Sequence, residues 1–276
     1  MRAATVLGAR EGPLTLDDGE LHLWMLRQPW TDDGPVRMVT SELDEEERKR
    51  AASFVRPHDR LLYLSAHIAL RRLLSAYTGL PPGRLPLERE PCAACGGPHG
   101  RPVLSTGPGG VLHFSLSHSH GLAVFGVARS PLGVDVEQVP SAETAALCAP
   151  ALHPAEQAEV LALPPGEQAM AFGRLWTRKE AYLKGIGTGL SRELSMDYLG
   201  ESDGRDAPSR PAGWVVRNVP GYPGHVAAVA LRTDTDHRMT ARVLPAAVLY
   251  ADDAADVIAG ARVRSSTVLA AARARG

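Results

Sequence analysis

The sequence has 276 residues, of which 44% are hydrophobic, and its 30 Lys and Arg residues nearly balance 31 Asp and Glu residues, for a net charge of −1. A chain of this length buries enough surface to fold without disulfides or metal ions, and its near-zero charge argues against a surface built for nucleic acid. No apolar run is long enough for a membrane span, and residues 1–10 lack the pattern of a signal peptide. We therefore expect a cytoplasmic protein whose three cysteines stay reduced.

Periodicity predicts the elements of the first half of the chain. Residues 21–26 alternate as in a short strand. Ser41 with Asp44 is an N-cap signal for a helix that ends before Pro57. Residues 58–77 have the Leu and Ala spacing of a longer helix.

The second half begins with a loop and continues with strands and helices. Residues 91–110 are rich in Gly, Pro and Cys and predict a loop, whereas 111–128 predict a strand pair or long hairpin. A short alternating strand is expected at 133–137. The remaining expected elements are helices at 153–162 and 166–184 and a buried strand at 225–231.

The length and the break at Pro131 predict an α+β protein with two lobes. We place an N-terminal lobe at residues 1–130 and a C-terminal lobe at residues 131–245. Residues 246–276 form an Ala-rich C-terminal extension in which the sequence gives no packing signal.

Asp135 and Glu137 lie two residues apart on the predicted strand at 133–137. Side chains alternate along a strand, so both carboxylates share one face, roughly 7 Å apart. Mg²⁺ takes one or two carboxylates together with water and phosphate oxygens, so this pair could hold one ion. The alternative is a half-exposed strand with a polar face.

Trp176, Glu180 and Lys184 follow one ridge of the predicted helix at 166–184, because they are four residues apart. Glu180 could complete a metal shell or accept a proton, and Lys184 could reach a phosphate. The alternative is an ordinary surface Glu/Lys pair.

Polar side chains cluster at the end of the strand before residue 120: Ser115, Ser117, His118, Ser119 and His120. Burying them without polar partners would be costly, so we expect them to face a cleft or solvent. His118 could donate to a phosphate or be a structural histidine. No Gly-x-Ser-x-Gly turn surrounds the serines, so none is predicted to be a nucleophile.

Cys92 and Cys95, with His99 nearby, have a spacing similar to that of zinc ligands. A closed structural zinc site needs four ligands, and no second pair follows at a suitable distance. A reduced loop or a redox pair are the other interpretations. The loop ends in Gly100-Arg101-Pro102, where the arginine is well placed for an anion.

Four segments, in this order, resemble the 4′-phosphopantetheinyl transferase superfamily, in its larger, two-lobed, surfactin-synthase-activating class. They are Gly100-Arg101-Pro102, FSLSHS at 114–119, GVDVE at 133–137 and WTRKEAYLKG at 176–185. Each segment alone is a weak signal, but the four together are specific. The resemblance covers about residues 41–190 and excludes the Cys92/Cys95 loop.

The resemblance implies two pseudo-symmetric α/β lobes with the active site at their interface. The implied reaction is Mg²⁺-dependent transfer of the 4′-phosphopantetheine arm of coenzyme A to a serine of an apo acyl, peptidyl or aryl carrier protein, which releases adenosine 3′,5′-bisphosphate. Such enzymes serve polyketide and nonribosomal peptide synthases. We also expect a monomer without nucleic-acid or membrane partners.

The resemblance also implies roles for individual residues. The metal ligands would be Asp135, Glu137 and Glu180; the catalytic residues Glu180, Lys184 and Asp135; and the coenzyme A contacts Arg71, Arg101, Ser117, His118 and Lys184. Arg71 matches the family arginine that faces the 3′-phosphate, although helix register leaves Arg72 as an alternative. Two other functions stay open: a non-catalytic coenzyme A-binding regulatory module, and a Mg²⁺-dependent phosphohydrolase.

Overall fold

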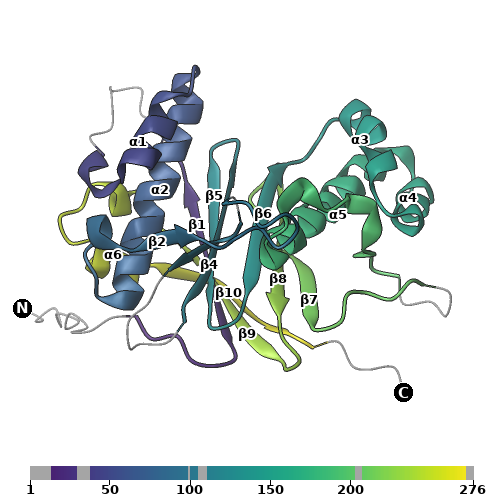
Figure 1. Cartoon of the computed structure of the whole chain (residues 1–276). Coiled ribbons are helices and arrows are strands. Elements are labelled where there is room, and N and C mark those ends of the chain that lie inside the picture. The colour runs from purple at the N-terminus through teal and green to yellow at the C-terminus, as the bar shows by residue number, and fades with distance from the viewer. Residues whose placement is uncertain (1–13, 30–37, 99, 105–110, 203–206, 272–276) are drawn as a thin grey trace, which may run out of the picture.

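The computed structural model describes residues 14–29, 38–98, 100–104, 111–202 and 207–271, and it is of the expected α+β class. Its helices are α1 (Glu45–Ala52), α2 (Pro57–Thr78), α3 (Ala142–Cys148), α4 (Pro154–Leu161), α5 (Pro165–Ile186) and α6 (Ala254–Ala259). Its strands are β1 (Glu20–Arg27), β2 (Leu87–Arg89), β3 (Pro102–Leu104), β4 (His113–Ser119), β5 (Leu122–Ala128), β6 (Leu132–Gln138), β7 (Trp214–Val219), β8 (His225–Arg232), β9 (His237–Val243) and β10 (Arg262–Leu269). The helices α1, α2 and α6 lie on one side of the strands and α3, α4 and α5 on the other (Figure 1).

Two main sheets meet in the middle of the molecule. Among the described residues, one sheet has the order β10-β9-β1-β5-β4 and the other the order β6-β8-β7, while β2 and β3 form a separate small hairpin. β1 pairs antiparallel with β5 and parallel with β9, so strands from both ends of the chain share one sheet. β4, at the edge of the first sheet, packs against β6 of the second.

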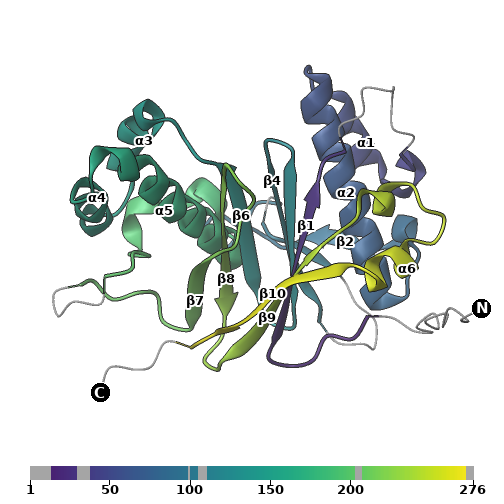
Figure 2. The same ribbon diagram turned by 180° about the vertical axis from the view of Figure 1, so that it is seen from behind.

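The return of the C-terminal strands was not expected from the sequence. β9 and β10 join the sheet that contains β1, although they follow the β6-β8-β7 sheet in the chain (Figure 2). The described part of residues 246–276 therefore packs against the rest of the protein. The division into three consecutive segments stays a prediction, and its boundaries do not coincide with those of the sheets.

Local signals explain where the long helices begin and end. The Glu47 N–H donates to Asp44 Oδ1 at 2.8 Å and the Asp44 N–H donates to Glu47 Oε2 at 3.0 Å, so a capping box starts α1 at Glu45. Gly79 and Gly187 follow α2 and α5 in the left-handed conformation, with φ of 72° and 78°.

A tight turn joins β4 to β5 at the edge of the first sheet. His120 and Gly121 both have positive φ, 45° and 79°. Two consecutive residues of this kind close a two-residue hairpin whose twist matches the strands. Among the described residues, His120 is the only non-glycine residue with a positive φ. It directly follows the polar segment of β4.

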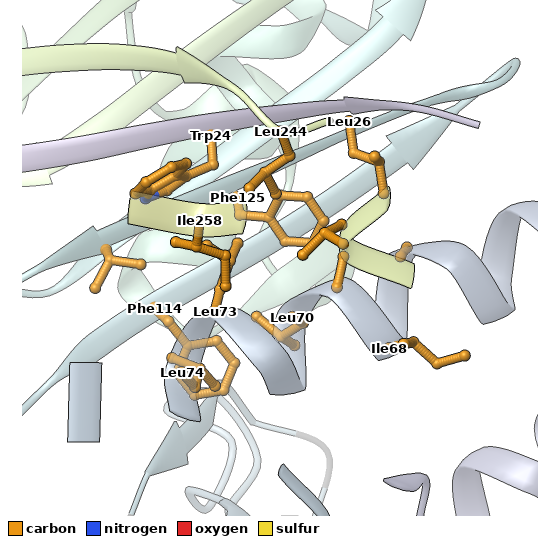
Figure 3. Close-up of a cluster of buried hydrophobic side chains, with 14 of the residues drawn as sticks. Trp24, Leu26, Ile68, Leu70, Leu73, Leu74, Phe114, Phe125, Leu244 and Ile258 are labelled. Carbon is orange, nitrogen blue, oxygen red and sulfur yellow. The ribbon is translucent and has the colours of Figure 1, made fainter. Parts of the chain in front are cut away.

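The first hydrophobic core lies between α2 and the sheet that contains β1. Figure 3 shows Trp24 and Phe125 from the strands packed toward Leu73 and Leu74 of α2, with Ile258 of α6 beside them. These side chains are at most 1% exposed. The C-terminal segment therefore contributes directly to this core.

A second core fills the space between the two sheets, and a third lies under α5. The second contains Val134 and Val136 of β6, whose alternate neighbour Asp135 contacts α5 instead. The third packs the α5 residues Ala181, Tyr182 and Leu183 on Val216, Ala228 and Ala230. β6 is thus held on both faces, which fixes the direction of its acidic side chains.

Most of the elements expected from the sequence are confirmed, and several were missed. The strands at 21–26, 133–137 and 225–231 and the helices at 58–77, 153–162 and 166–184 lie within or close to observed elements. The expected hairpin at 111–128 corresponds to β4 and β5. The sequence reading missed α3, α6, β2, β7, β9 and β10, and it placed β3 in a loop.

Candidate functional site

Asp135 is the central residue of the site. It lies on β6 and is 2% exposed. Its Oδ1 accepts a hydrogen bond from the Ser117 hydroxyl at 2.9 Å and from the Lys184 ammonium at 2.6 Å. Its Oδ2 is also buried but has no hydrogen-bond partner in the structure. A buried carboxylate oxygen without a partner is unfavourable, so this atom is available to a cation or donor.

Glu137 lies two residues further along β6, on the same face of the strand. Its Oε2 accepts a hydrogen bond from the Ser119 hydroxyl at 2.7 Å. Burial raises the pKa of this carboxyl above its ordinary value, and the nearby Asp135 charge raises it further. The predicted arrangement, with Asp135 and Glu137 opposite the apolar Val134 and Val136, is confirmed.

Glu180 and Lys184 come from α5, which packs on β6. Burial raises the pKa of Glu180, and the negative charges of Asp135 and Glu137 also raise it. The Lys184 ammonium donates to the Ser117 hydroxyl oxygen at 2.9 Å in addition to Asp135. The helix therefore brings a third carboxyl group and a cation to the acidic face of β6.

The electrostatics of these groups favour an additional positive charge. Three carboxyl groups influence each other while one ammonium, from Lys184, is paired with Asp135. Carboxylate oxygens are the donors that Mg²⁺ prefers. The donor types therefore fit Mg²⁺, but among the described residues no three His, Cys, Asp or Glu side chains are already gathered around one metal position.

The serines of β4 are buried, whereas the sequence led us to expect them at a cleft or in solvent. Ser115, Ser117 and Ser119 are 6–8% exposed. Each has a partner on β6: Ser115 Oγ accepts the Val134 N–H at 3.0 Å, and the other two bind the carboxylates. The serine hydroxyls thus connect β4 to β6 through hydrogen bonds, and these bonds compensate for the burial of the hydroxyls.

His118 points to the opposite face of β4 from these serines. Its ring meets the Tyr63 ring edge-on at 6.2 Å between centroids, and Tyr63 stacks on His67. Burial lowers the pKa of His118 to about 4, and His67 and Lys184 lower it as well. His118 is therefore a neutral imidazole at neutral pH, with one N–H to donate.

Arg101 approaches the same region from the hairpin of β2 and β3. Its Nη2 donates to both carboxylate oxygens of Glu90, at 3.0 and 2.9 Å, and its Nη1 donates to the Gly185 carbonyl at 3.2 Å. Its Nε is buried without a partner. Arg101 thus connects this hairpin to the end of α5, one residue after Lys184.

Comparison with known proteins bears directly on this arrangement. Residues 131–213 match the family model described as the 4′-phosphopantetheinyl transferase superfamily. The chain is 32% identical over 185 residues to the 4′-phosphopantetheinyl transferase HetI of Nostoc, covering 65% of this chain and 73% of that protein. The chain belongs to the 4′-phosphopantetheinyl transferase superfamily.

Other members of the superfamily show the same likeness. The 4′-phosphopantetheinyl transferase psf-1 of Bacillus pumilus is 28% identical, covering 68% of this chain and 78% of that protein. The 4′-phosphopantetheinyl transferase Sfp of Bacillus subtilis is 26% identical, covering 56% and 64%. The resemblance stated from the four sequence segments is therefore confirmed.

Arg71 and Arg72, which the superfamily resemblance suggested as 3′-phosphate contacts, are both buried in this transferase. Arg71 donates through Nε to Glu47, through Nη2 to Asp44 and through Nη1 to the Pro82 carbonyl. Arg72 binds Glu42 with two nitrogens. These nitrogens already have partners, so a phosphate role for either residue stays a prediction and would require exchange of an ion pair.

The cysteine loop lies next to Arg101 but outside the segments that the superfamily resemblance uses. Cys92 is buried and Cys95 is exposed, and neither is in a disulfide. His99, the third suggested zinc ligand, lies outside the described residues. Cys92 and Cys95 alone supply two of the four ligands that a structural zinc site needs.

Sequence reasoning missed two contributions to the site of this transferase. Ser119 was not assigned a role, although it binds Glu137 as Ser117 binds Asp135. The alternation of serines at 115, 117 and 119 is the signal that could have paired them with the acidic face of β6. Tyr63, which meets the His118 ring edge-on, and His67, which stacks on Tyr63, follow no motif and could be found only in three dimensions.

Proposed function

We propose that this 4′-phosphopantetheinyl transferase moves the phosphopantetheine arm of coenzyme A to a serine of an apo carrier protein, with Mg²⁺, at the junction of its two lobes. The activity named for its relatives and the matched family supports the reaction class. The cation, the substrate and the carrier partner are part of the proposal. Localisation in the cytoplasm and a monomeric state stay predictions from the sequence.

The observation that carries the proposal is the buried Oδ2 of Asp135, which has no partner. The other oxygen of the same carboxylate is already bound by Ser117 and Lys184. One oxygen is therefore held in place by the protein, and the second is left for a ligand. A cation at this atom would also relieve the raised pKa values of Glu137 and Glu180.

Asp135, Glu137 and Glu180 would hold Mg²⁺, which when bound neutralises negative charge on the pyrophosphate oxygens of coenzyme A. The Lys184 ammonium donates to both Asp135 and Ser117, so it can move from Asp135 to a phosphate oxygen. The neutral His118 can donate one N–H to a phosphate without adding a charge that burial would oppose.

The nucleophile in this proposal is the carrier serine, which agrees with the structure because the β4 serines are all engaged with β6. As the serine oxygen attacks the phosphorus, its proton must leave. Glu180 has a raised pKa and is therefore a better proton acceptor than an ordinary carboxylate. We assign it this role, alongside its contribution to holding the ion.

The test is intact-protein mass spectrometry of an apo carrier protein after incubation with this protein, coenzyme A and Mg²⁺. Wild type should add one phosphopantetheine group in a reaction that EDTA stops. Asp135→Asn should reduce the rate by more than about 100-fold, the usual scale for the loss of one preorganised charge in a site. Asp252→Asn, at an exposed position, is the matched control and should leave the rate unchanged.

Three other outcomes would count against the proposal. Transfer that continues at the wild-type rate in Asp135→Asn would remove the acidic face of β6 from the reaction. Release of free phosphopantetheine without a carrier would indicate the phosphohydrolase. Binding of coenzyme A without modification of several carrier proteins would indicate the regulatory module.

A further inference from the structure

The β2–β3 hairpin ends in a compact turn that contains two cysteines. The Cys92 N–H donates to the Gly97 carbonyl and the Gly96 N–H donates to the Cys92 carbonyl, both at 2.8 Å. Gly96 has a φ of 71°, a conformation that suits glycine. These bonds close the loop, so Cys92 and Cys95 are held within a single turn.

The two thiols of this turn differ in environment. Cys92 is 3% exposed, whereas Cys95 is exposed. The Cys92 sulfur accepts hydrogen bonds from the backbone N–H groups of Ala94 and Cys95 and from the side chains of Cys95 and Ser191, which together lower its pKa. The turn therefore pairs one accessible sulfur with one buried sulfur that is stabilised as a thiolate.

The turn is also connected to the proposed coenzyme A site. The Glu90 N–H donates to the Arg101 carbonyl at 3.0 Å, and the Glu90 carboxylate holds the Arg101 guanidinium. On the other side, Cys92 contacts Ser191, in the 3-10 turn Gly189–Ser191 that follows α5. A change at Cys92 can therefore alter the position of Glu90, which binds Arg101, and of the segment that follows α5.

We propose that Cys92 and Cys95 form a reversible oxidation site for low-molecular-weight disulfides, and that its oxidation weakens coenzyme A binding through Arg101. The second half of this inference rests on the proposed function. The first half depends only on the thiols and their surroundings.

The chemistry is two successive thiol–disulfide exchanges. The exposed Cys95 thiolate attacks one sulfur of the small disulfide, which forms a mixed disulfide at Cys95 and releases the first small thiolate. The Cys92 thiolate then attacks the Cys95 sulfur, which forms the Cys92–Cys95 bond and releases the second. The two protein thiols lose two electrons to the small disulfide, and their two protons end on the released thiols.

Oxidation must change the contacts that hold the turn. In the disulfide, the Cys92 sulfur is bonded to the Cys95 sulfur and is a weaker acceptor than the free sulfur, so its hydrogen bonds with Ala94, Cys95 and Ser191 weaken. The turn and the segment after α5 then lose a common contact. Because Glu90 and Arg101 stand at the base of this turn, their positions shift relative to Gly185.

A zinc site is the competing use of the same thiols. Zinc in structural sites takes four ligands, and within the described ranges no group of three or more His, Cys, Asp or Glu side chains is gathered here. An oxidation site, by contrast, is complete with two cysteines. Zinc is therefore treated as an outcome of the test.

The first experiment incubates reduced full-length protein with hydroxyethyl disulfide, a probe without phosphate that cannot compete for coenzyme A. Intact mass should show the loss of two hydrogen atoms, and alkylation should then label Cys148 but neither Cys92 nor Cys95. Cys92→Ser should stop at the mixed disulfide on Cys95. Cys148→Ser is the matched control and should be oxidised like wild type.

The second experiment measures coenzyme A binding to the same samples by calorimetry. Oxidised wild type should bind about tenfold more weakly than reduced protein, as expected for one weakened charge-assisted hydrogen bond, and dithiothreitol should restore the affinity. Cys148→Ser keeps both thiols of the turn, so oxidation should weaken its coenzyme A binding as much as that of wild type. An unchanged affinity in oxidised wild type would overturn the link to Arg101.

The outcomes separate this inference from the proposed function. Thiols that do not react with the probe, in protein that binds coenzyme A normally, would overturn the oxidation site alone. Stoichiometric zinc that protects both thiols from alkylation would also overturn it. Reduced protein that neither binds coenzyme A nor modifies a carrier would instead contradict the proposed function, whatever the thiols do.

Discussion

At the scale of single residues, His22 shows how burial and one hydrogen bond fix a protonation state. His22 is 6% exposed on β1, and its Nδ1 lies 2.6 Å from the Tyr77 hydroxyl. The Trp24 Nε1–H donates to the same hydroxyl oxygen at 3.0 Å, so the Tyr77 O–H is left to donate to His22. Burial, and next the Arg242 charge, lower the pKa of His22 to about 4.

This shift predicts a loss of stability in mild acid. The imidazole of the unfolded chain binds a proton below pH 6.5, whereas the folded chain does so only below about 4. Between these values the unfolded state binds more protons, so the free energy of unfolding falls as the pH falls, by up to about 3 kcal/mol. Urea unfolding at neutral pH and near pH 5 measures it.

His22→Gln is the comparison, because an amide oxygen can still accept from Tyr77 but does not titrate. The variant should lose less stability than wild type between the two pH values. His118 has a lowered pKa as well, and its contribution to the loss of stability in acid is the same in both proteins. Equal losses in variant and wild type would show that His22 is not the group responsible.

Residue types and spacing predicted the acidic face but not all of its partners. Asp135 and Glu137 were found because alternation along a strand is a local rule. The partners of Arg71 were not, since Glu47 is 24 residues away and nothing in the sequence says which carboxylate an arginine meets. Long-range ion pairs are therefore the part of this site that a single sequence leaves open.

At the scale of elements, the contact between β6 and α5 brings the acidic groups together. Gly133 is the closest point of this contact: a Cβ there would lie 2.0 Å from the Ala181 carbonyl oxygen and 2.5 Å from the Gly185 nitrogen. Both of these atoms belong to the backbone of α5, so they cannot yield as a flexible side chain would. The absence of a side chain at Gly133 therefore sets the distance of Glu180 and Lys184 from Asp135.

Gly133→Ala should push α5 away from β6. We expect a loss of about 3 kcal/mol in the free energy of unfolding, at the upper end of overpacking effects. The transfer rate should fall further than this loss explains, because Lys184 would lose its 2.6 Å contact with Asp135. Urea unfolding and the carrier assay on the same preparations measure both effects.

Gly166→Ala, on the α5 helix that Gly133 contacts, provides the control. A Cβ at Gly166 has nothing within 4 Å, and the position has no positive φ. Alanine is the better helix former by about 1 kcal/mol, so this variant should be as stable as wild type or more so, with unchanged transfer. If Gly133→Ala behaves in the same way, the close contact between β6 and α5 does not control the site.

Five residues before Lys184, α5 carries an ion pair that could not be predicted from its sequence. Lys179 is 2% exposed, and its ammonium lies 2.8 Å from a carboxylate oxygen of the fully buried Glu156 on α4. The Leu199 N–H donates to the other oxygen at 2.6 Å. A lysine beside Glu180 in a motif looks like a second functional cation, but here tertiary packing gives it a structural role.

At the scale of the whole molecule, the C-terminal segment returns to the sheet that contains β1 and to the core over α2. The 3-10 turn Ala246–Leu249 and α6 place Val248, Leu249 and Ile258 in the core over α2, each at most 1% exposed. Arg72 donates to the Val248 and Ala251 carbonyls, 176 and 179 residues away. Local periodicity has no access to such distances, which is why the sequence left this segment without a partner.

A chain that ends at Pro245 should therefore not fold stably. It loses three fully buried aliphatic side chains, at about 2 kcal/mol each, and two acceptors of the buried Arg72 guanidinium. The sum is comparable to the whole stability of an ordinary domain, about 5–15 kcal/mol. It also exposes the edge of β9, which β10 covers in the full chain (Figure 2).

Circular dichroism during urea unfolding, with limited proteolysis, tests this expectation. The matched control is a chain that ends at Ala271, which keeps α6 and β10 and should unfold at the same urea concentration as the full protein. The shorter chain should be cut by protease without added urea or aggregate through its open edge. A cooperative transition at the full-length urea concentration would mean that α2 and the strands β1, β4 and β5 hold the first hydrophobic core without the returning segment.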